Sequence, residues 1–151
     1  MALKIVTGAD QKILRTKTKR VPAVTKEVQK LLKEMEKATV KADGLGLAAP
    51  QVGLDMRMCI ARINGRLTPL VNPEITWKSK ITETAEEGCL SLPGIWVPVS
   101  RAVEIVVQYQ TARGDKKELK LSDMDARVVQ HETDHLDGKL IIDYVSAAAV
   151  L

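Results

Sequence analysis

The chain has 151 residues, of which 45% are hydrophobic and 28% are charged, a composition that excludes an intrinsically disordered protein. Aromatic residues make up only 3%, so the formal net charge of +4 is not accompanied by the stacking side chains of a surface that binds nucleic-acid bases. No apolar run approaches the length of a membrane span, and no linker or repeat divides the sequence, so we expect one soluble domain over residues 1–151.

The first predicted element is an amphipathic helix over about residues 25–41. Thr25 can cap its N-terminus, and apolar side chains recur along it at helical spacing. The apolar positions are Val24, Val28, Leu31, Leu32 and Met35. Lysines are scattered along the chain, and we interpret most of them as ordinary solvated surface residues.

The helix is followed by GLGLAAPQVG, residues 44–53, in which Gly44, Gly46 and Ala49 fit the dinucleotide-binding pattern G-x-G-x-x-G/A. A turn of that kind must follow a strand and open a helix. Here a helix comes first, and Pro50 opposes a second helix starting inside the motif. We therefore reject a dinucleotide-binding role for this stretch.

The predicted strands lie between the glycine stretch and the C-terminal region. MRMCIARI and RLTPLV flank Asn64-Gly65, a dipeptide typical of a two-residue hairpin turn. A further strand is expected in WKSKITETAE, residues 77–86. AVEIVVQYQ and KKELKL flank a second turn at residues 113–115.

The two cysteines lie in different contexts. Cys59 lies within the apolar strand MRMCIARI, where a thiol behaves as a small hydrophobic side chain, so we expect it in the core. Cys89 lies in TAEEGCLSLPG, between a glycine and a predicted turn, where no strand pattern requires an apolar residue. A disulfide between them is disfavoured, because two cysteines without a secretion signal seldom pair.

The last predicted element is a helix over about residues 123–137, which Ser122 can cap and which carries both histidines of the chain in QHETDHLDG. Positions i and i+4 share a helix face, so the side chains of His131 and His135 converge and can hold one metal ion. Glu132 stands where the glutamate of a His-Glu-x-x-His hydrolase handles the proton of the attacking water. The simpler interpretation is that two polar residues share a solvated helix face.

These elements predict an α+β fold with mostly antiparallel strands packed around a C-terminal metal-binding helix and with an N-terminal helix. The order of the strands does not follow from the sequence. A metal site also needs a third ligand, and no histidine remains to supply it. Carboxylates are numerous, but a Cys89 thiolate with two imidazoles would leave a fourth position open for water and would suit zinc, cobalt, nickel or ferrous iron about equally.

Three stretches occur in the order found in peptide deformylases, and through them the chain resembles this family from residue 44 to residue 138. The stretches are GLGLAAPQVG, EGCLSLP and QHETDHLDG. The EGCLS form is similar to the bacterial and organellar type. The resemblance implies a single catalytic domain that removes the N-formyl group from the N-terminal formyl-methionine of newly made polypeptides and releases formate.

The resemblance also implies the roles of individual residues. The implied metal ligands are Cys89, His131 and His135. Glu132 matches the general base and acid, and Gln51 matches a donor to the oxyanion together with the backbone N–H of Leu90. Fe²⁺ is implied as the native metal ion, with Zn²⁺, Ni²⁺ or Co²⁺ able to replace it in preparations.

The family holds its substrate peptide in an extended conformation, which implies backbone contacts here. The implied positions are Leu45, Gly46 and Gly88. For the methionine side chain we expect an apolar wall of Met124 and Val128 with Leu45, although each of these is equally well interpreted as core. Arg127 is expected to line the same wall with its stem while its charged head stays in water.

Two other functions remain open. A zinc endopeptidase of the His-Glu-x-x-His kind would take Glu86 or Glu87 as its third ligand, but it would leave the glutamine and cysteine motifs unexplained. A catalytically inactive relative that only binds peptides is the second, and it would be expected to have lost Glu132 or Gln51. Both residues are present.

The expected partners are nascent formyl-methionyl polypeptides, with no membrane and no specific nucleic acid. Many bacterial members continue into a basic C-terminal helix associated with ribosome docking, whereas SAAAVL, residues 146–151, follows the metal helix here. We therefore expect only transient ribosome proximity. A monomer is favoured, and we expect a cytoplasmic protein, although an organellar one without its transit peptide would have the same features.

Overall fold

The computed structural model describes residues 2–145. The SAAAVL segment lies outside them, so the expectation of only transient ribosome proximity, which rests on this segment, stays a prediction. The helices are α1 (Lys26–Lys41) and α2 (Asp123–Leu136), with short 3-10 helices η1 (Lys12–Arg15), η2 (Ala49–Val52) and η3 (Ile141–Tyr144). The strands are β1 (Gly46–Ala48), β2 (Met58–Ile63), β3 (Arg66–Lys78), β4 (Thr82–Cys89), β5 (Leu92–Ala102), β6 (Glu104–Gln110) and β7 (Lys116–Ser122). None of the described helices is both long and apolar enough to cross a membrane.

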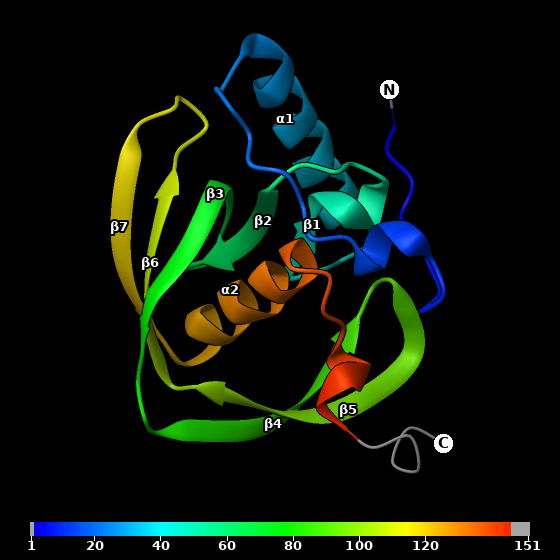
Figure 1. The fold of residues 1–151 in the computed structure, drawn as a ribbon, viewed down its shortest axis with the longest axis vertical. Helices are drawn as coiled ribbons and strands as arrows, with labels where there is room; N and C mark the ends of the chain where they lie inside the picture. The colour runs from blue at the N-terminus through cyan, green and yellow to red at the C-terminus, as the bar shows by residue number, and fades with distance from the viewer. Residues whose placement is uncertain (1, 146–151) are drawn as a thin grey trace.

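The strands form two antiparallel sheets around α2, which confirms the predicted α+β fold. One sheet has five strands in the order β1-β2-β3-β6-β7, and the other consists of β4 and β5. Figure 1 shows α2 in the middle of the molecule, with the five-stranded sheet on one side and the long β4–β5 pair running past the other. The central helix therefore carries its histidines between the two sheets.

The sequence predicted the hairpin turns more accurately than it predicted the bounds of the strands. Asn64 and Gly65 both have a positive φ, 54° and 76°, as a two-residue turn between twisted strands requires. The single strand expected over residues 77–86 is wrong, because β3 ends at Lys78 and β4 begins at Thr82. The turn predicted after Cys89 is present at Leu90 and Ser91, but the sequence did not predict β5, which begins at Leu92 and pairs in continuous register with β4 from Trp96 to Ala102.

Helix α2 begins and ends as its sequence suggests, with one exception. Ser122 occupies the N-cap position, but its side chain makes no capping hydrogen bond, so that expectation is wrong. Gly138 directly follows the C-cap residue with a φ of 75°, as expected of a glycine that ends a helix. A side chain there would also collide with the chain, because its Cβ would lie 2.6 Å from the carbonyl oxygen of Arg15.

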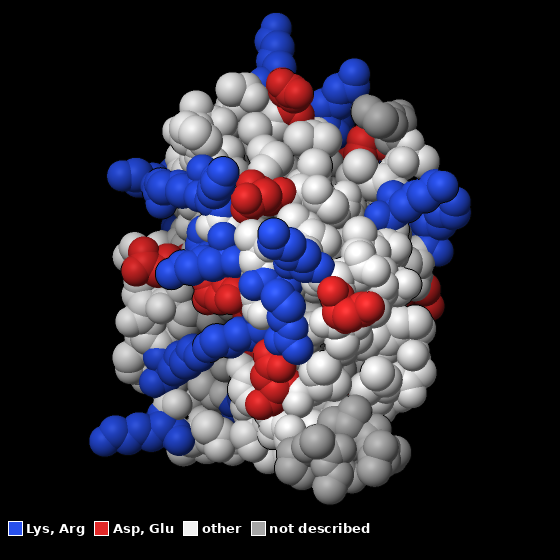
Figure 2. Space-filling view, turned by 45° about the vertical axis from the view of Figure 1, so that its right-hand side comes forward, with Lys and Arg blue, Asp and Glu red and all other residues white. Residues whose placement is uncertain are grey.

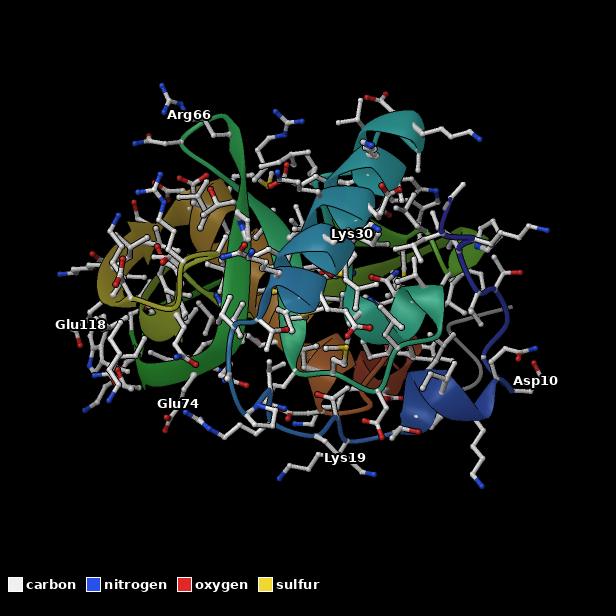
Figure 3. All side chains as sticks on the ribbon, turned by 90° about the horizontal axis from the view of Figure 1, so that it is seen from above. Asp10, Lys19, Lys30, Arg66, Glu74 and Glu118 are labelled. Carbon is white, nitrogen blue, oxygen red and sulfur yellow. The ribbon has the colours of Figure 1, made fainter. Side chains whose placement is uncertain are left out.

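The N-terminal helix α1 packs one face on the sheet and turns a basic face outward. Its Thr25 cap is confirmed, since the hydroxyl accepts a hydrogen bond of 3.2 Å from the N–H of Val28. Five exposed lysines repeat along the opposite face, so those of α1 are not scattered as we expected: Lys26, Lys30, Lys33, Lys37 and Lys41. Figure 2 shows Lys and Arg side chains gathered on one face of the molecule, and Figure 3 labels Lys30 on α1.

Candidate active site

Three potential metal ligands converge from two elements. Cys89 is the last residue of β4, while His131 and His135 lie one turn apart on α2. Their donor atoms all lie within 4.8 Å of one another, with the Cys89 sulfur 3.4 Å from His135 Nε2 and the two Nε2 atoms 3.2 Å apart. A thiolate and two imidazoles at this separation fit a single divalent transition-metal ion. Cys59, in contrast, is completely buried in the core, as expected.

Glu87 lies behind His131 and holds its ring in place. One carboxylate oxygen is 2.9 Å from His131 Nδ1, and because a carboxylate only accepts, Nδ1 carries the proton and Nε2 keeps its lone pair for a metal. The Arg101 guanidinium donates two hydrogen bonds of 2.9 Å to the same carboxylate. Burial alone would raise the pKa of Glu87, but the bonds from Arg101 and His131 hold that pKa well below its usual range. Both oxygens of Glu87 are thus occupied by Arg101, Arg127 and the Nδ1 side of His131, which argues against the endopeptidase alternative in which Glu87 is the third metal ligand.

Arg127 does not extend into water, so that expectation is wrong. Its side chain is 11% exposed, and its guanidinium donates to Glu87 at 2.6 Å. It also donates to the backbone carbonyls of Val99 at 2.9 Å and Glu83 at 2.6 Å. The sequence could not show this, because the acceptors lie on β4 and β5, which become neighbours of α2 only in the folded chain.

Glu132 points into the site across the backbone of Gly46. A Cβ at Gly46 would lie 2.5 Å from Glu132 Oε2 and 2.8 Å from the carbonyl oxygen of Ile60, so only glycine fits there. The other carboxylate oxygen, Oε1, is buried without a hydrogen-bond partner among residues 2–145. Burial raises the pKa of Glu132 to about 7. A carboxyl group with this pKa can both take up and release a proton near neutral pH.

Gln51 presents its amide nitrogen to the cysteine. The side chain is 2% exposed, and its oxygen accepts a hydrogen bond of 2.9 Å from the N–H of Ala48. Its NH₂ group therefore faces Ser91 Oγ at 3.1 Å and the Cys89 sulfur at 3.7 Å. Leu90 follows Cys89 directly and lines the same cavity.

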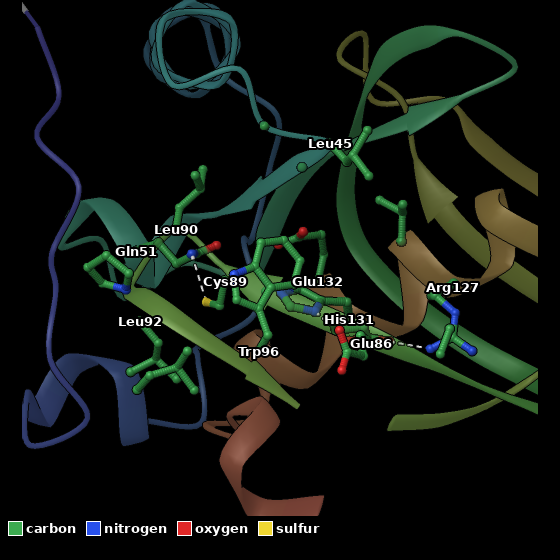
Figure 4. A pocket seen from close by; sticks show the side chains of 18 of the residues that line it. Leu45, Gln51, Glu86, Cys89, Leu90, Leu92, Trp96, Arg127, His131 and Glu132 are labelled. Atoms are coloured by element: carbon green, nitrogen blue, oxygen red, sulfur yellow. Dashed lines mark hydrogen bonds and ion pairs between the residues drawn. The ribbon is translucent and has the colours of Figure 1, made fainter. Parts of the chain in front are cut away.

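Cys89, His131, Glu132 and Gln51 border one cavity of about 500 Å³, which Figure 4 shows at close range. All the positions expected to contact substrate line it: Leu45, Gly46, Gly88, Met124 and Val128. Leu45 and Met124 are 49% and 57% exposed, so they are not core residues, whereas Val128 is 6% exposed and also packs in the core. Trp96 and Glu86 line the cavity as well. Trp96 was missed because β5 was not predicted around it.

Comparison with known proteins agrees with the motifs. The sequence profile of the family described as polypeptide deformylase matches residues 2–150. The chain belongs to this family. The peptide deformylase of Thermotoga maritima is 43% identical over 136 residues, which cover 90% of this chain and 83% of that protein. The peptide deformylase of Pseudothermotoga lettingae is 41% identical over 136 residues, which cover 90% of this chain and 79% of that protein.

Solved deformylase structures share the whole fold. The crystal structure of the Thermotoga maritima peptide deformylase matches with a TM-score of 0.93 at 40% identity, covering 97% of this chain and 99% of that one. A class I type b peptide deformylase from Acinetobacter baumannii, solved with Met-Ala-Ser bound, matches with a TM-score of 0.90 at 31% identity, covering 96% and 99% of the two chains. The resemblance inferred from three short motifs is therefore confirmed along nearly the whole chain.

Proposed function

We propose that the Cys89, His131 and His135 cluster is the catalytic centre at which this deformylase removes the formyl group from the N-terminal methionine of new polypeptides. The products are formate and a free amino terminus. The observation that carries the proposal is the convergence of three metal-type donor atoms within 4.8 Å at a cavity that Glu132 and Gln51 also line. Residues from all three sequence motifs line this cavity.

The three residues of the cluster would hold one divalent metal ion. We propose Fe²⁺ as the native ion, with Zn²⁺, Ni²⁺ or Co²⁺ able to replace it, because thiolate and imidazole donors suit all of them. The bound ion would polarise the formyl carbonyl and make the attacking water more acidic. Glu87 supports the site from behind, since its hydrogen bond of 2.9 Å fixes the His131 ring with Nε2 free.

Glu132 handles the protons of the reaction. Its carboxylate takes a proton from the attacking water, whose oxygen then forms a bond to the formyl carbon. Negative charge develops on the formyl oxygen, and the Gln51 amide and the backbone N–H of Leu90 are the donors that stabilise it. Glu132 then returns the proton to the methionine nitrogen as the C–N bond breaks. Two observations support this role. Glu132 Oε1 has no hydrogen-bond partner in the described chain, so it is available to the substrate and water. Glu132 Oε2 lies close against Gly46, which limits how far the carboxylate can move.

The substrate peptide would lie along the free edge of β4. In the described part of the chain β4 pairs only with β5, so its other edge can accept an extended peptide. The methionine side chain would then enter the cavity against Met124 and Val128, with Leu45 at its mouth and the backbone close to Gly46 and Gly88. The Acinetobacter baumannii relative supports the class of substrate, because the Met-Ala-Ser bound to it is what remains when formyl-Met-Ala-Ser loses its formyl group.

We propose a monomeric protein that meets nascent chains in the cytoplasm, as a single catalytic domain over residues 1–151. The five exposed lysines of α1 support transient attraction to the polyanionic ribosome surface. Size-exclusion chromatography with light scattering tests the monomer, for which a mass near 16.6 kDa is expected. A mass near twice this value would contradict it.

The decisive experiment measures formate release from formyl-Met-Ala-Ser. Anaerobically purified protein loaded with Fe²⁺ or Ni²⁺ should release formate, and Glu132→Gln should lower kcat by at least ~10²–10⁴, the usual contribution of a general base. Metal content and far-UV circular dichroism of the variant should stay unchanged, which separates lost chemistry from lost structure. A folded, fully metal-loaded protein that releases no formate would overturn the proposal.

A further inference from the structure

An exposed tryptophan lies at the mouth of the cavity, directly beside the metal ligands. Trp96 is 67% exposed, although burying an aromatic ring normally stabilises a fold. It pairs across β4 and β5 with Gly88, the residue that precedes Cys89. A Cβ at Gly88 would lie 2.9, 2.9 and 3.0 Å from Cη2, Cζ3 and Cζ2 of the indole, so the six-membered ring rests on the glycine backbone.

The β4–β5 pair has two faces with different chemistry. Glu87 belongs to the face that packs on α2, where its carboxylate meets His131. Side chains alternate along a strand, so Glu86 and Gly88 belong to the opposite face, which their cross-strand partners Pro98 and Trp96 share. Trp96 and Glu86 therefore border the cavity from the face turned away from α2, and Figure 4 shows both beside it.

A peptide added to the edge of β4 must alternate in the same way. If the methionine side chain points toward Val128 on α2, the side chain of the next residue points to the opposite face. That face carries the indole ring lying on Gly88 and the carboxylate of Glu86. This step rests on the proposed function, because it uses the proposed pose of the substrate.

The charge of Glu86 indicates which side chain fits there. Glu86 is exposed, and within residues 2–145 its carboxylate forms no ion pair. An aromatic face beside an unpaired carboxylate suits a long side chain with a cationic end, whose stem covers the ring while its charge meets the carboxylate. We propose that Trp96 and Glu86 form a subsite for the residue after formyl-methionine, and that this subsite favours lysine or arginine over neutral and acidic residues.

The test compares peptides formyl-Met-X-Ser in which X is lysine, its uncharged analogue norleucine, or glutamate. Exposed cation–π contacts and exposed ion pairs are each modest, so kcat/KM should be roughly 3- to 10-fold higher for lysine than for norleucine and lowest for glutamate. Trp96→Ala and Glu86→Gln each remove one of the two contributions, so each should lower the lysine-to-norleucine ratio toward one. Because the ratio is taken within one protein, partial unfolding of a variant cancels from it.

Matched controls exist elsewhere on the surface. Trp77→Ala removes the 46% exposed tryptophan of β3, and Glu74→Gln neutralises an exposed glutamate of the same strand, and neither residue lines the cavity. Both controls should keep the wild-type ratio. Equal kcat/KM for lysine and norleucine in the wild type, or a ratio that survives both cavity variants, would overturn the subsite. Formyl-Met-Ala-Ser separates the two proposals, because a protein that cleaves it without any preference at X fails only this inference, whereas one that cleaves no peptide fails the proposed function.

Discussion

At the scale of single residues, the candidate site depends on close approaches that larger side chains would block. Gly46 lets the Glu132 carboxylate lie against the backbone, and Gly88 lets the Trp96 ring do the same on the other side of the cavity. Neither glycine has a positive φ, so both are required by space and not by backbone conformation. The glycines of the motifs are thus part of the site geometry.

Gly46→Ala should reduce deformylation by about 100-fold, because a displacement of Glu132 by about 1 Å is enough for such a loss. The new Cβ would lie 2.5 Å from Glu132 Oε2 and 2.8 Å from the Ile60 carbonyl, and that backbone cannot move easily. Steady-state kinetics with formyl-Met-Ala-Ser measures the effect.

Gly65→Ala is the matched control for this substitution. Gly65 has a φ of 76° in open space at a hairpin turn, so alanine there should lower stability by about 1 kcal/mol and leave kcat/KM near the wild-type value. If Gly46→Ala kept more than a third of the activity, the steric argument would be wrong.

At the scale of elements, one carboxylate joins three of them. Glu87 of β4 contacts Arg101 of β5 and Arg127 of α2, whose side chains are 5% and 11% exposed. Arg101 also forms an ion pair with a second carboxylate, that of Asp134 on α2, with 2.5 Å between Arg101 Nη1 and Asp134 Oδ2. The strand that ends in the cysteine is thereby tied to the helix that carries the histidines.

Glu87→Ala should destabilise the fold by about 3–5 kcal/mol, because it leaves the Arg127 guanidinium without a counter-charge and leaves Arg101 with Asp134 alone. Metal affinity should also fall by about 10- to 100-fold, since the His131 ring loses the group that orients it. Urea unfolding measures the first effect, and competition with a chelator measures the second. Glu118→Ala, at an exposed site on β7, is the control and should change neither. Wild-type metal affinity in Glu87→Ala would show that His131 needs no support.

The last 3-10 helix is tied to the same network by Tyr144, whose hydroxyl donates to Asp134 at 2.5 Å. Burial and this hydrogen bond raise the pKa of Tyr144 to about 12, from the ordinary tyrosine value of 10.0 in the unfolded chain. The folded-state pKa is the higher one, so the stability that the phenol contributes is complete below pH 10 and is lost as the pH rises toward 12.

Tyr144→Phe should therefore be less stable than the wild type at pH 8, and the difference between the two proteins should shrink by pH 11. Urea unfolding at both pH values gives the comparison, and the variant corrects for the ionisation of Tyr109. A difference that is constant across this range would rule out the hydrogen bond to Asp134 as its source.

At the scale of the whole molecule, the buried apolar side chains of the described residues form three clusters. The first joins α2 to the large sheet, and the second joins α1 to β1, β2 and β3. The third packs η1 and η3 against β5 through Leu14, Leu92, Val97 and Leu140. Only the first cluster contains α2 residues, and the small sheet is tied to the helix by hydrogen bonds that Arg127 of α2 donates to β4 and β5.

The two tryptophans can test whether the chain unfolds as one unit, because Trp77 lies in the large sheet and Trp96 in the two-stranded one. Fluorescence of Trp77→Phe and Trp96→Phe, each with one tryptophan left, should show the same urea midpoint as circular dichroism of the same variant. A lower midpoint from the tryptophan of β5 alone would show that the small sheet unfolds independently.

The sequence by itself determined what depends on neighbours along the chain. The spacing of His131 and His135, the Thr25 cap and the Asn64-Gly65 turn all act within a few residues, so periodicity and turn chemistry were sufficient to predict them. The three motifs likewise identified the family, because their order and residue types are visible without coordinates.

The tertiary structure decided what depends on partners far apart in sequence. Glu87 and His131 are separated by 44 positions, so the carboxylate that orients the ring could not be distinguished from a possible metal ligand until β4 was packed on α2. Arg101 and Arg127 are likewise distant from Glu87 in sequence, so their ion pairs with it appear only in the folded chain. The strand β5 has weak local propensity because of Pro93, Gly94 and Pro98, and only its pairing with β4 brings Trp96 over Gly88. Local sequence sets which backbone forms, whereas burial and pairing between distant segments set which side chains meet.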